Sequence, residues 1–249
     1  MNNYNILVLG ASGSGKTSFL ASMYDKLSVQ RPSIGFFVEF PENERKILVN
    51  KYREMENPTK EWPAGTKDVD EWKITCSVHA GDKNYPLLEF AYLDYAVGKL
   101  SEPESSNPSE SFSIDKAAED AEAILILLDC LKILHQLKGE QEKLSSPLHN
   151  DLRFILPIVQ KYISKPLHFV ITKWDLLEGT YNLKQVRESL LEDERLSAIV
   201  AQRRTHHNPT RLIPVSAVGK GFATLSQDNT MVKNPKGVAR PFQVEIPVA

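Results

Sequence analysis

GASGSGKT, at residues 10–17, directly follows the apolar run ILVL at residues 6–9. The eight residues fit the pattern G-x-x-x-x-G-K-[ST] of a phosphate-binding loop. A strand that ends in glycines and opens into a helix directs several backbone N–H groups and the positive end of the helix at one point. Lys16 can reach the outer phosphates of a nucleotide, and the Thr17 hydroxyl can ligate Mg²⁺. The pattern therefore predicts a nucleotide site at the end of the first strand.

The composition is that of an ordinary globular protein. The chain has 249 residues, of which 41% are apolar and 25% are charged, and its formal net charge is −2. This charge argues against a field that draws the chain to nucleic acid or to an anionic membrane. The sequence has no transmembrane segment and no secretory signal, so we expect a cytoplasmic protein. The two cysteines, Cys76 and Cys130, lack metal-ligand spacing and are expected to be buried free thiols.

Apolar strands alternate with helical patterns along the chain. Continuous apolar strands separated by helices predict a mainly parallel sheet that is covered on both faces. Residues 71–80 and 85–94 alternate in polarity and flank Gly81-Asp82-Lys83-Asn84, which predicts an antiparallel hairpin at one edge. We expect strands at 5–9, 71–80, 85–94, 124–129, 167–172 and 212–216, and helices at 16–28, 42–56, 117–122, 152–164 and 183–204.

The length suits a single domain over residues 1–249 with three insertions. The insertions lie near 101–113, 131–150 and 218–241 and are rich in Ser, Pro, Gly and polar residues. For the first two we expect surface loops, the second with a short helix as an option. The sequence ends at Ala249 without a strongly patterned last helix, which suggests a piece of a longer protein.

A second motif, Thr172-Lys173-Trp174-Asp175, follows the predicted strand at 167–172 and so emerges at the same end of the sheet as the phosphate loop. The Asp175 carboxylate can accept hydrogen bonds from N1–H and the 2-amino group of guanine. Adenine lacks both donors and would leave the carboxylate unpaired, so the motif selects guanine. Lys173 can lie along the base and the ribose. Asp175 as a simple helix cap is the structural alternative.

The next predicted strand ends in Val215-Ser216-Ala217. At this position the backbone N–H of Ala217 can bond the guanine O6. The string is short, but it ends the next predicted strand after Thr172-Lys173-Trp174-Asp175. This order and placement assign it to the same predicted base site.

These motifs resemble, in content and order, those of the Ras-like small GTPases of the TRAFAC class of P-loop proteins. The resemblance runs from about Asn5 to Ala217. It implies a three-layer α/β/α P-loop GTPase fold, with a mostly parallel sheet and one antiparallel edge strand. It also implies binding of GTP and GDP with Mg²⁺. The residues that match the family's nucleotide contacts are Gly13, Ser14, Gly15, Lys16, Thr17, Ser18, Thr172, Lys173, Asp175, Ser216 and Ala217.

The resemblance assigns the rest of the magnesium and γ-phosphate site less directly. Asp94 closes an apolar strand where the family has D-x-x-G, which implies that it holds Mg²⁺ through a water. Gly98 follows one residue too late, so either Gly98 or the N–H of Val97 serves the γ-phosphate. Thr66 is preferred over Thr59 as the switch threonine that contacts Mg²⁺ and the γ-phosphate. The string W-P-x-G-T that ends at Thr66 is similar to bacterial GTPases of conflict systems, including double-GTPase types.

Two departures from the family predict slow turnover. The residues after Gly98 are Lys99-Leu100-Ser101, with no glutamine to orient the attacking water, and Ser12 stands where many relatives have glycine. Arg31, Arg45 and Arg53 are candidates for a cationic group in cis. We therefore expect a GTP-dependent switch that hydrolyses GTP slowly and binds a protein effector or regulator. A pseudo-GTPase that only binds nucleotide is the alternative, and Asp175 argues against a P-loop ATPase or kinase.

Overall fold

The computed structural model describes residues 3–32, 34–63, 70–96, 108–139, 146–205, 208, 210–226, 228 and 230–248. Seven strands form one sheet in the order β2-β3-β4-β1-β5-β6-β7, and two more form a separate hairpin. The strands are β1 (Asn3–Gly10), β2 (Phe37–Glu39), β3 (Asp70–Ala80), β4 (Lys83–Ala96), β5 (Ala123–Asp129), β6 (Leu167–Thr172), β7 (Arg211–Pro214), β8 (Ala223–Leu225) and β9 (Met231–Lys233). The helices are α1 (Lys16–Leu27), α2 (Glu42–Glu56), α3 (Pro108–Asp120), α4 (Cys130–Leu137), α5 (Pro147–Lys161), α6 (Leu183–Leu190) and α7 (Glu194–Thr205).

The main sheet is mostly parallel. β1 lies between β4 and β5 and is parallel to both, and β5, β6 and β7 continue the parallel order. β3 runs against its neighbours, because it forms the expected hairpin with β4 and pairs antiparallel with β2. The fold class predicted from the sequence is confirmed. The three-residue strand β2, which lies beyond β3, was not predicted.

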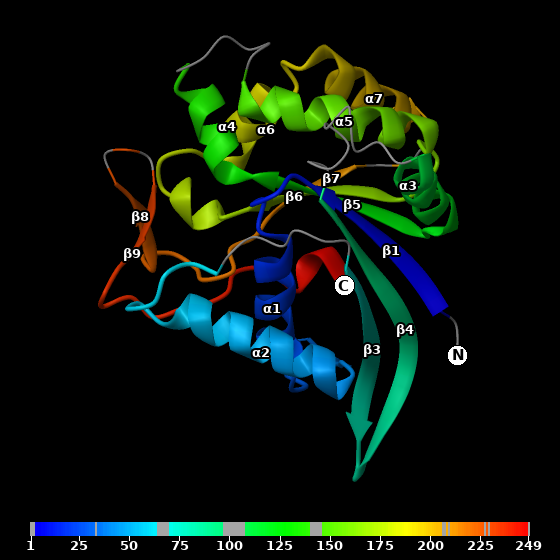
Figure 1. Ribbon diagram of the computed structural model, residues 1–249, viewed down its shortest axis with the longest axis vertical. Helices are drawn as coiled ribbons and strands as arrows, with labels where there is room; N and C mark the ends of the chain where they lie inside the picture. Colours follow the sequence, from blue (N-terminus) through cyan, green and yellow to red (C-terminus); the bar gives the residue numbers. More distant parts are fainter. Residues whose placement is uncertain are drawn as a thin grey trace.

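Helices cover both faces of this sheet, which gives three layers. Figure 1 shows α1 and α2 on one side, and α3 to α7 on the other. The strand β5 is buried on both faces, since Leu125 and Leu127 pack in the α1–α2 core, and Ile124 and Ile126 pack in the core under α3–α7. Burial of each such apolar side chain stabilises the folded protein by about 1.5–3 kcal/mol relative to leaving it exposed to water. Burial on both faces therefore explains why these strands are continuous apolar runs.

The helical layer on the α3–α7 side differs from the sequence expectations. The helix expected at 117–122 begins at Pro108, so the loop expected at 101–113 is helical in its second part. The helix expected at 152–164 begins at Pro147, where the Ser146 side chain accepts a hydrogen bond from the His149 N–H. Proline suits the first turn of a helix because its missing N–H would have no partner there. The short helix considered within 131–150 is α4.

The long helix expected at 183–204 is wrong, because the structure has two helices. α6 begins with a capping box between Asn182 and Gln185 and ends at Leu190. The Asp193 side chain then accepts hydrogen bonds from the N–H groups of Arg195 and Leu196 at 3.1 and 3.0 Å. Asp193 thus caps α7 as a separate helix, because its side chain satisfies N–H groups of the first turn that have no partner within that helix.

The segment expected as an insertion at 218–241 contains the β8–β9 hairpin and then returns to the sheet. Ser216 and Phe242 exchange two backbone hydrogen bonds, of 3.0 and 2.9 Å, where it returns. Cys76 and Cys130 are buried and free, as expected. Within the described residues, no helix combines the length and the apolar character that a membrane crossing requires.

Candidate nucleotide-binding site

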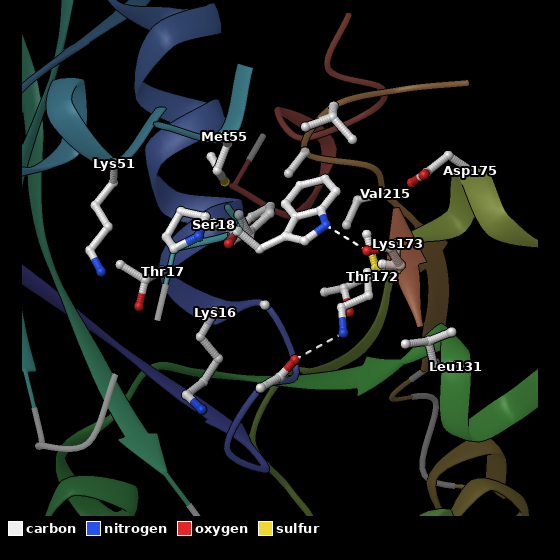
Figure 2. Close-up of a pocket in the computed structure, with 18 of the residues that line it drawn as sticks. Lys16, Thr17, Ser18, Lys51, Met55, Leu131, Thr172, Lys173, Asp175 and Val215 are labelled. Atoms are coloured by element: carbon white, nitrogen blue, oxygen red, sulfur yellow. Dashed lines mark hydrogen bonds between the residues drawn. The ribbon is translucent and has the colours of Figure 1, made fainter. Parts of the chain in front are cut away.

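A cavity of about 530 Å³ opens at the carboxyl ends of the parallel strands, where the phosphate loop follows β1 (Figure 2). Both sequence motifs contribute to its lining, together with the end of α2 and the hairpin region after β7. The lining residues are Gly13, Gly15, Lys16, Thr17, Ser18, Phe19, Lys51, Met55, Trp62, Pro63, Leu131, Thr172, Lys173, Asp175, Val215, Ala217, Val218, Thr230 and Met231.

The phosphate loop has the expected conformation. Gly15, directly before α1, has a φ of 87°, a left-handed value that glycine adopts without strain. A Cβ at Gly10 would lie 2.6 Å from the Ser14 Oγ, so this position also needs glycine. Lys16 is only 5% exposed, and its Nζ donates to the carbonyls of Gly10 and Ala11 at 2.9 and 3.1 Å. Its charge is therefore held inside the loop.

The second motif is tied to the phosphate loop by hydrogen bonds. The Thr172 Oγ1 donates to the Ser14 carbonyl at 2.6 Å. Lys173 has a φ of 55°, and its Nζ lies 3.0 Å from the Gly13 carbonyl, as drawn in Figure 2. These contacts hold the two motifs together, so Thr172 acts by positioning the loop.

Asp129 belongs to this network, and the sequence analysis did not select it. It ends β5, is 7% exposed, and its Oδ2 lies 2.7 Å from the Lys173 Nζ. Its Oδ1 accepts a hydrogen bond from the Leu131 N–H and so caps α4. The signal in the sequence was an acidic residue that closes a buried strand at the functional end of the sheet. Asp129 thus directs Lys173 toward Gly13.

Asp175 lies in the 3₁₀ helix η3 (Trp174–Leu176) at the other side of the cavity from Thr17 (Figure 2). It is 9% exposed, and its Oδ1 accepts a hydrogen bond of 2.5 Å from the Ser216 hydroxyl. Among the described residues, its buried Oδ2 has no hydrogen-bond partner. Burial raises the pKa of the Asp175 carboxyl above its usual value. An unpaired buried carboxylate oxygen is costly, and a ligand with N–H donors would satisfy it.

Ser216 serves Asp175 and the loop that follows. Besides its bond to Asp175, the Ser216 Oγ accepts a hydrogen bond of 2.7 Å from the Gly219 N–H. The Ser216 side chain is buried, whereas Ala217 lines the cavity. Of the two residues expected to bind the base, Ser216 positions the Asp175 carboxylate, and Ala217 lines the cavity.

The residues that the sequence analysis expects to bind Mg²⁺ are described only in part. The backbone of Asp94 lies on β4, paired with Val8 of β1, so it is near the functional end of the sheet. Thr66 and Gly98 lie outside the described residues. Thr17 lines the cavity. In the part of the chain that the structure describes, no cluster of three His, Cys, Asp or Glu side chains could hold a metal by itself.

The basic side chain that α2 contributes to the cavity is Lys51. In Figure 2 it lies on the side of Lys16 and Thr17, away from Asp175. The candidates for a cation supplied in cis were Arg31, Arg45 and Arg53. All three are exposed, and none is among the described residues that line the cavity. Helix α2 thus contributes a lysine to the cavity lining, and the three arginines do not line it.

Comparisons with known proteins give similar solved structures. No family model matches the chain, and no curated protein matches its sequence. The signal recognition particle receptor SRb-GTP/SRX complex from Chaetomium thermophilum is 15% identical over 89% of this chain and 94% of that chain, with a TM-score of 0.49. An Era variant from Aquifex aeolicus bound to GDP.AlF4⁻ is 16% identical over 94% and 63%, with a TM-score of 0.41. The G domain of the T. maritima FeoB iron transporter is 14% identical over 88% and 92%, with a TM-score of 0.37.

Proposed function

We propose that this chain binds GTP and GDP and acts as a GTP-dependent switch with slow hydrolysis. The observation that carries the proposal is the unpaired Oδ2 of buried Asp175, in the same cavity as the phosphate-loop residue Lys16. Guanine offers two N–H donors to such a carboxylate, and adenine offers neither. A phosphate loop and a guanine-selective carboxylate at two sides of one cavity fit a guanine nucleotide.

The remaining roles follow from this placement. The backbone N–H groups of residues 13–18 and the Lys16 ammonium hold the phosphates. Thr17 and Thr66 are the proposed ligands of Mg²⁺, and Asp94 holds one of its waters. When bound, the metal ion neutralises charge that develops on the phosphates. The segments that contain Thr66 and Gly98 would order around the γ-phosphate and relax after its loss, which is the basis of a switch.

The proposal extends to the partner of this protein and to its place in the cell. A switch of this kind acts through a protein effector or regulator, and we place the protein in the cytoplasm. We treat residues 1–249 as one domain, whose insertions supply α4 and the β8–β9 hairpin.

Turnover without a partner is expected to be slow, at about 10⁻³ s⁻¹ or below, as for GTPases that lack an arginine supplied in trans. The reason is the absence of a glutamine among Lys99-Leu100-Ser101. Single-turnover release of phosphate from GTP with Mg²⁺ measures the rate. Replacement of Lys51 by alanine should slow it further, while Lys46→Ala on the same helix is the control, because Lys46 is exposed and paired with Glu42. Fast turnover in the wild type would contradict the proposal of a slow enzyme, and no turnover with tight GTP binding would favour the pseudo-GTPase.

The affinity for GDP is expected to fall as the pH is lowered. Guanine donors need the ionised form of Asp175, and burial raises the pKa of this carboxyl, so the free protein takes up the competing proton at a higher pH than an exposed aspartate does. Below that raised pKa, binding of GDP should release a proton. Calorimetric titrations in buffers of different ionisation enthalpy measure this release. A GDP affinity that is constant down to the usual pKa of aspartate would contradict the assignment.

A further inference from the structure

The β8–β9 hairpin is fastened to the end of α2 by one buried lysine. Lys233, the last residue of β9, is 7% exposed. Its Nζ donates to the carbonyls of Glu54, Asn57 and Glu61 at 2.6, 2.9 and 3.3 Å. A cation at a helix C-terminus satisfies carbonyls that have no partner within the helix and complements the helix dipole. Lys233 therefore fixes both the last turn of α2 and the segment that follows it.

A tryptophan from that segment makes the second connection. The Trp62 Nε1 donates to the Met231 carbonyl of β9 at 2.9 Å. The Lys233 Nζ lies 4.7 Å from the centre of the Trp62 ring, and Phe222 meets the ring edge-on at 6.2 Å. A cation over an indole face and an edge-on aromatic pair each add to the stability of this contact. The segment before residue 64 is thus held by the hairpin through side chains and backbone.

The residues that make these connections also line the cavity. Trp62 and Pro63 line it from the α2 side, and Thr230 and Met231 line it from the hairpin. Lys16 and Asp175, at the two ends of the proposed ligand, line the same cavity. A nucleotide that reaches both ends would share its space with this wall. Thr66, the proposed switch threonine, follows Pro63 by three residues in the sequence.

We propose that the β8–β9 hairpin is a clasp on the nucleotide site, which holds the cavity wall at Trp62 and Pro63 through Lys233. Nucleotide binding and docking of the hairpin then stabilise each other. Because such coupling is reciprocal, loosening the hairpin weakens nucleotide binding, and a bound nucleotide tightens the hairpin. This inference rests on the proposed function, and it makes the hairpin the element through which occupancy of the site is sensed outside the cavity.

The test combines GDP affinity with hydrogen exchange of the full chain. In the wild type, Mg²⁺ and GDP should slow amide exchange at 223–225 and 231–233. Lys233→Met should raise the Kd for GDP by about tenfold, within the usual size of coupling between linked sites, and should abolish the slowing at saturating GDP. Lys236→Met is the matched control, because Lys236 is exposed in the turn after β9 and should change neither result.

A second variant keeps the inference testable if Lys233→Met does not fold. Trp62→Phe keeps an aromatic ring but removes the N–H donated to Met231, so it should reduce the GDP-dependent slowing in the hairpin while the circular dichroism stays that of the wild type. Lys233→Arg keeps a cation at this position, so it should bind GDP more tightly than Lys233→Met and less tightly than the wild type. The inference is overturned if GDP leaves exchange in the hairpin unchanged, or if the folded Lys233→Met and Trp62→Phe variants bind GDP as the wild type does. A wild type that binds no guanine nucleotide overturns the proposed function instead.

Discussion

Asp175→Asn should weaken the binding of GDP by about 100-fold or more, since it removes two hydrogen bonds to a charged group. It should also admit xanthosine diphosphate. Xanthine carries an oxygen where guanine carries its 2-amino group, and the asparagine amide can donate to that oxygen. Competition with a fluorescent nucleotide, with GDP, xanthosine diphosphate and ADP as competitors, measures the preference. Asp115→Asn is the control, because Asp115 is half-exposed and paired with Lys161 on the helical layer.

The same variant should be at least as stable as the wild type without nucleotide. Burial raises the pKa of Asp175, which means that the folded protein without nucleotide disfavours the ionised carboxylate. A neutral asparagine removes this cost and keeps a partner for Ser216. A thermal midpoint that is equal or higher, together with lost GDP affinity, would mark Asp175 as a residue kept for binding. An unchanged preference for guanine would place the base site elsewhere.

The core of the site could be predicted because its information is local. A phosphate loop is specified by eight consecutive residues, and the glycine positions follow from the backbone conformation that they need. The segment at 172–175 is also continuous, and the parallel order of β1 and β6 brings it to the same end as the loop. Strands such as β5 could be found because burial on both faces requires continuous apolar residues.

The missed parts of the site depend on contacts between distant segments. The partner of Lys233 is the end of α2, about 175 residues earlier in the chain, and composition marks both segments only as polar. The role of Asp129 at the end of β5 depends on its contact with Lys173, which follows the neighbouring strand β6. The break between α6 and α7 depends on whether Asp193 caps a new helix or stays within one. These choices are decided by tertiary packing, which a helical pattern does not reveal.

The contacts between segments give the cavity two different kinds of wall. The phosphate and base residues stand on the ends of buried parallel strands, which packing on both faces makes rigid. The wall at Trp62 stands on the end of α2 and on the β8–β9 hairpin, which are joined by Lys233, by the Trp62 indole N–H and by the contact between the Trp62 and Phe222 rings. A switch needs a stable binding edge and a part that can move, and elements with few buried contacts supply the second. The β8–β9 hairpin, which lies in the insertion at 218–241, therefore belongs to the proposed function.

Lys16→Met should raise the Kd for GDP and GTP by about 100-fold or more, because it removes charge-assisted hydrogen bonds to the phosphates. The affinity for GMP should change much less, since GMP lacks the outer phosphates that Lys16 reaches. Isothermal titrations with GMP, GDP and GTP at constant Mg²⁺ measure the difference. Lys46→Met is the control, because Lys46 is exposed on α2 and should leave all three affinities unchanged.

Stability separates a phosphate-binding role of Lys16 from a purely structural one. Methionine at position 16 loses the two hydrogen bonds from the Lys16 Nζ to carbonyls, but it also removes the cost of burying an ammonium group, and these two effects oppose each other. The variant without nucleotide should therefore melt near the wild-type temperature. Equal losses of affinity for GMP and GTP, or a large fall in the melting temperature, would mean that Lys16 supports the loop. A loss that grows from GMP to GDP, with the melting temperature unchanged, would place the outer phosphates at its ammonium group.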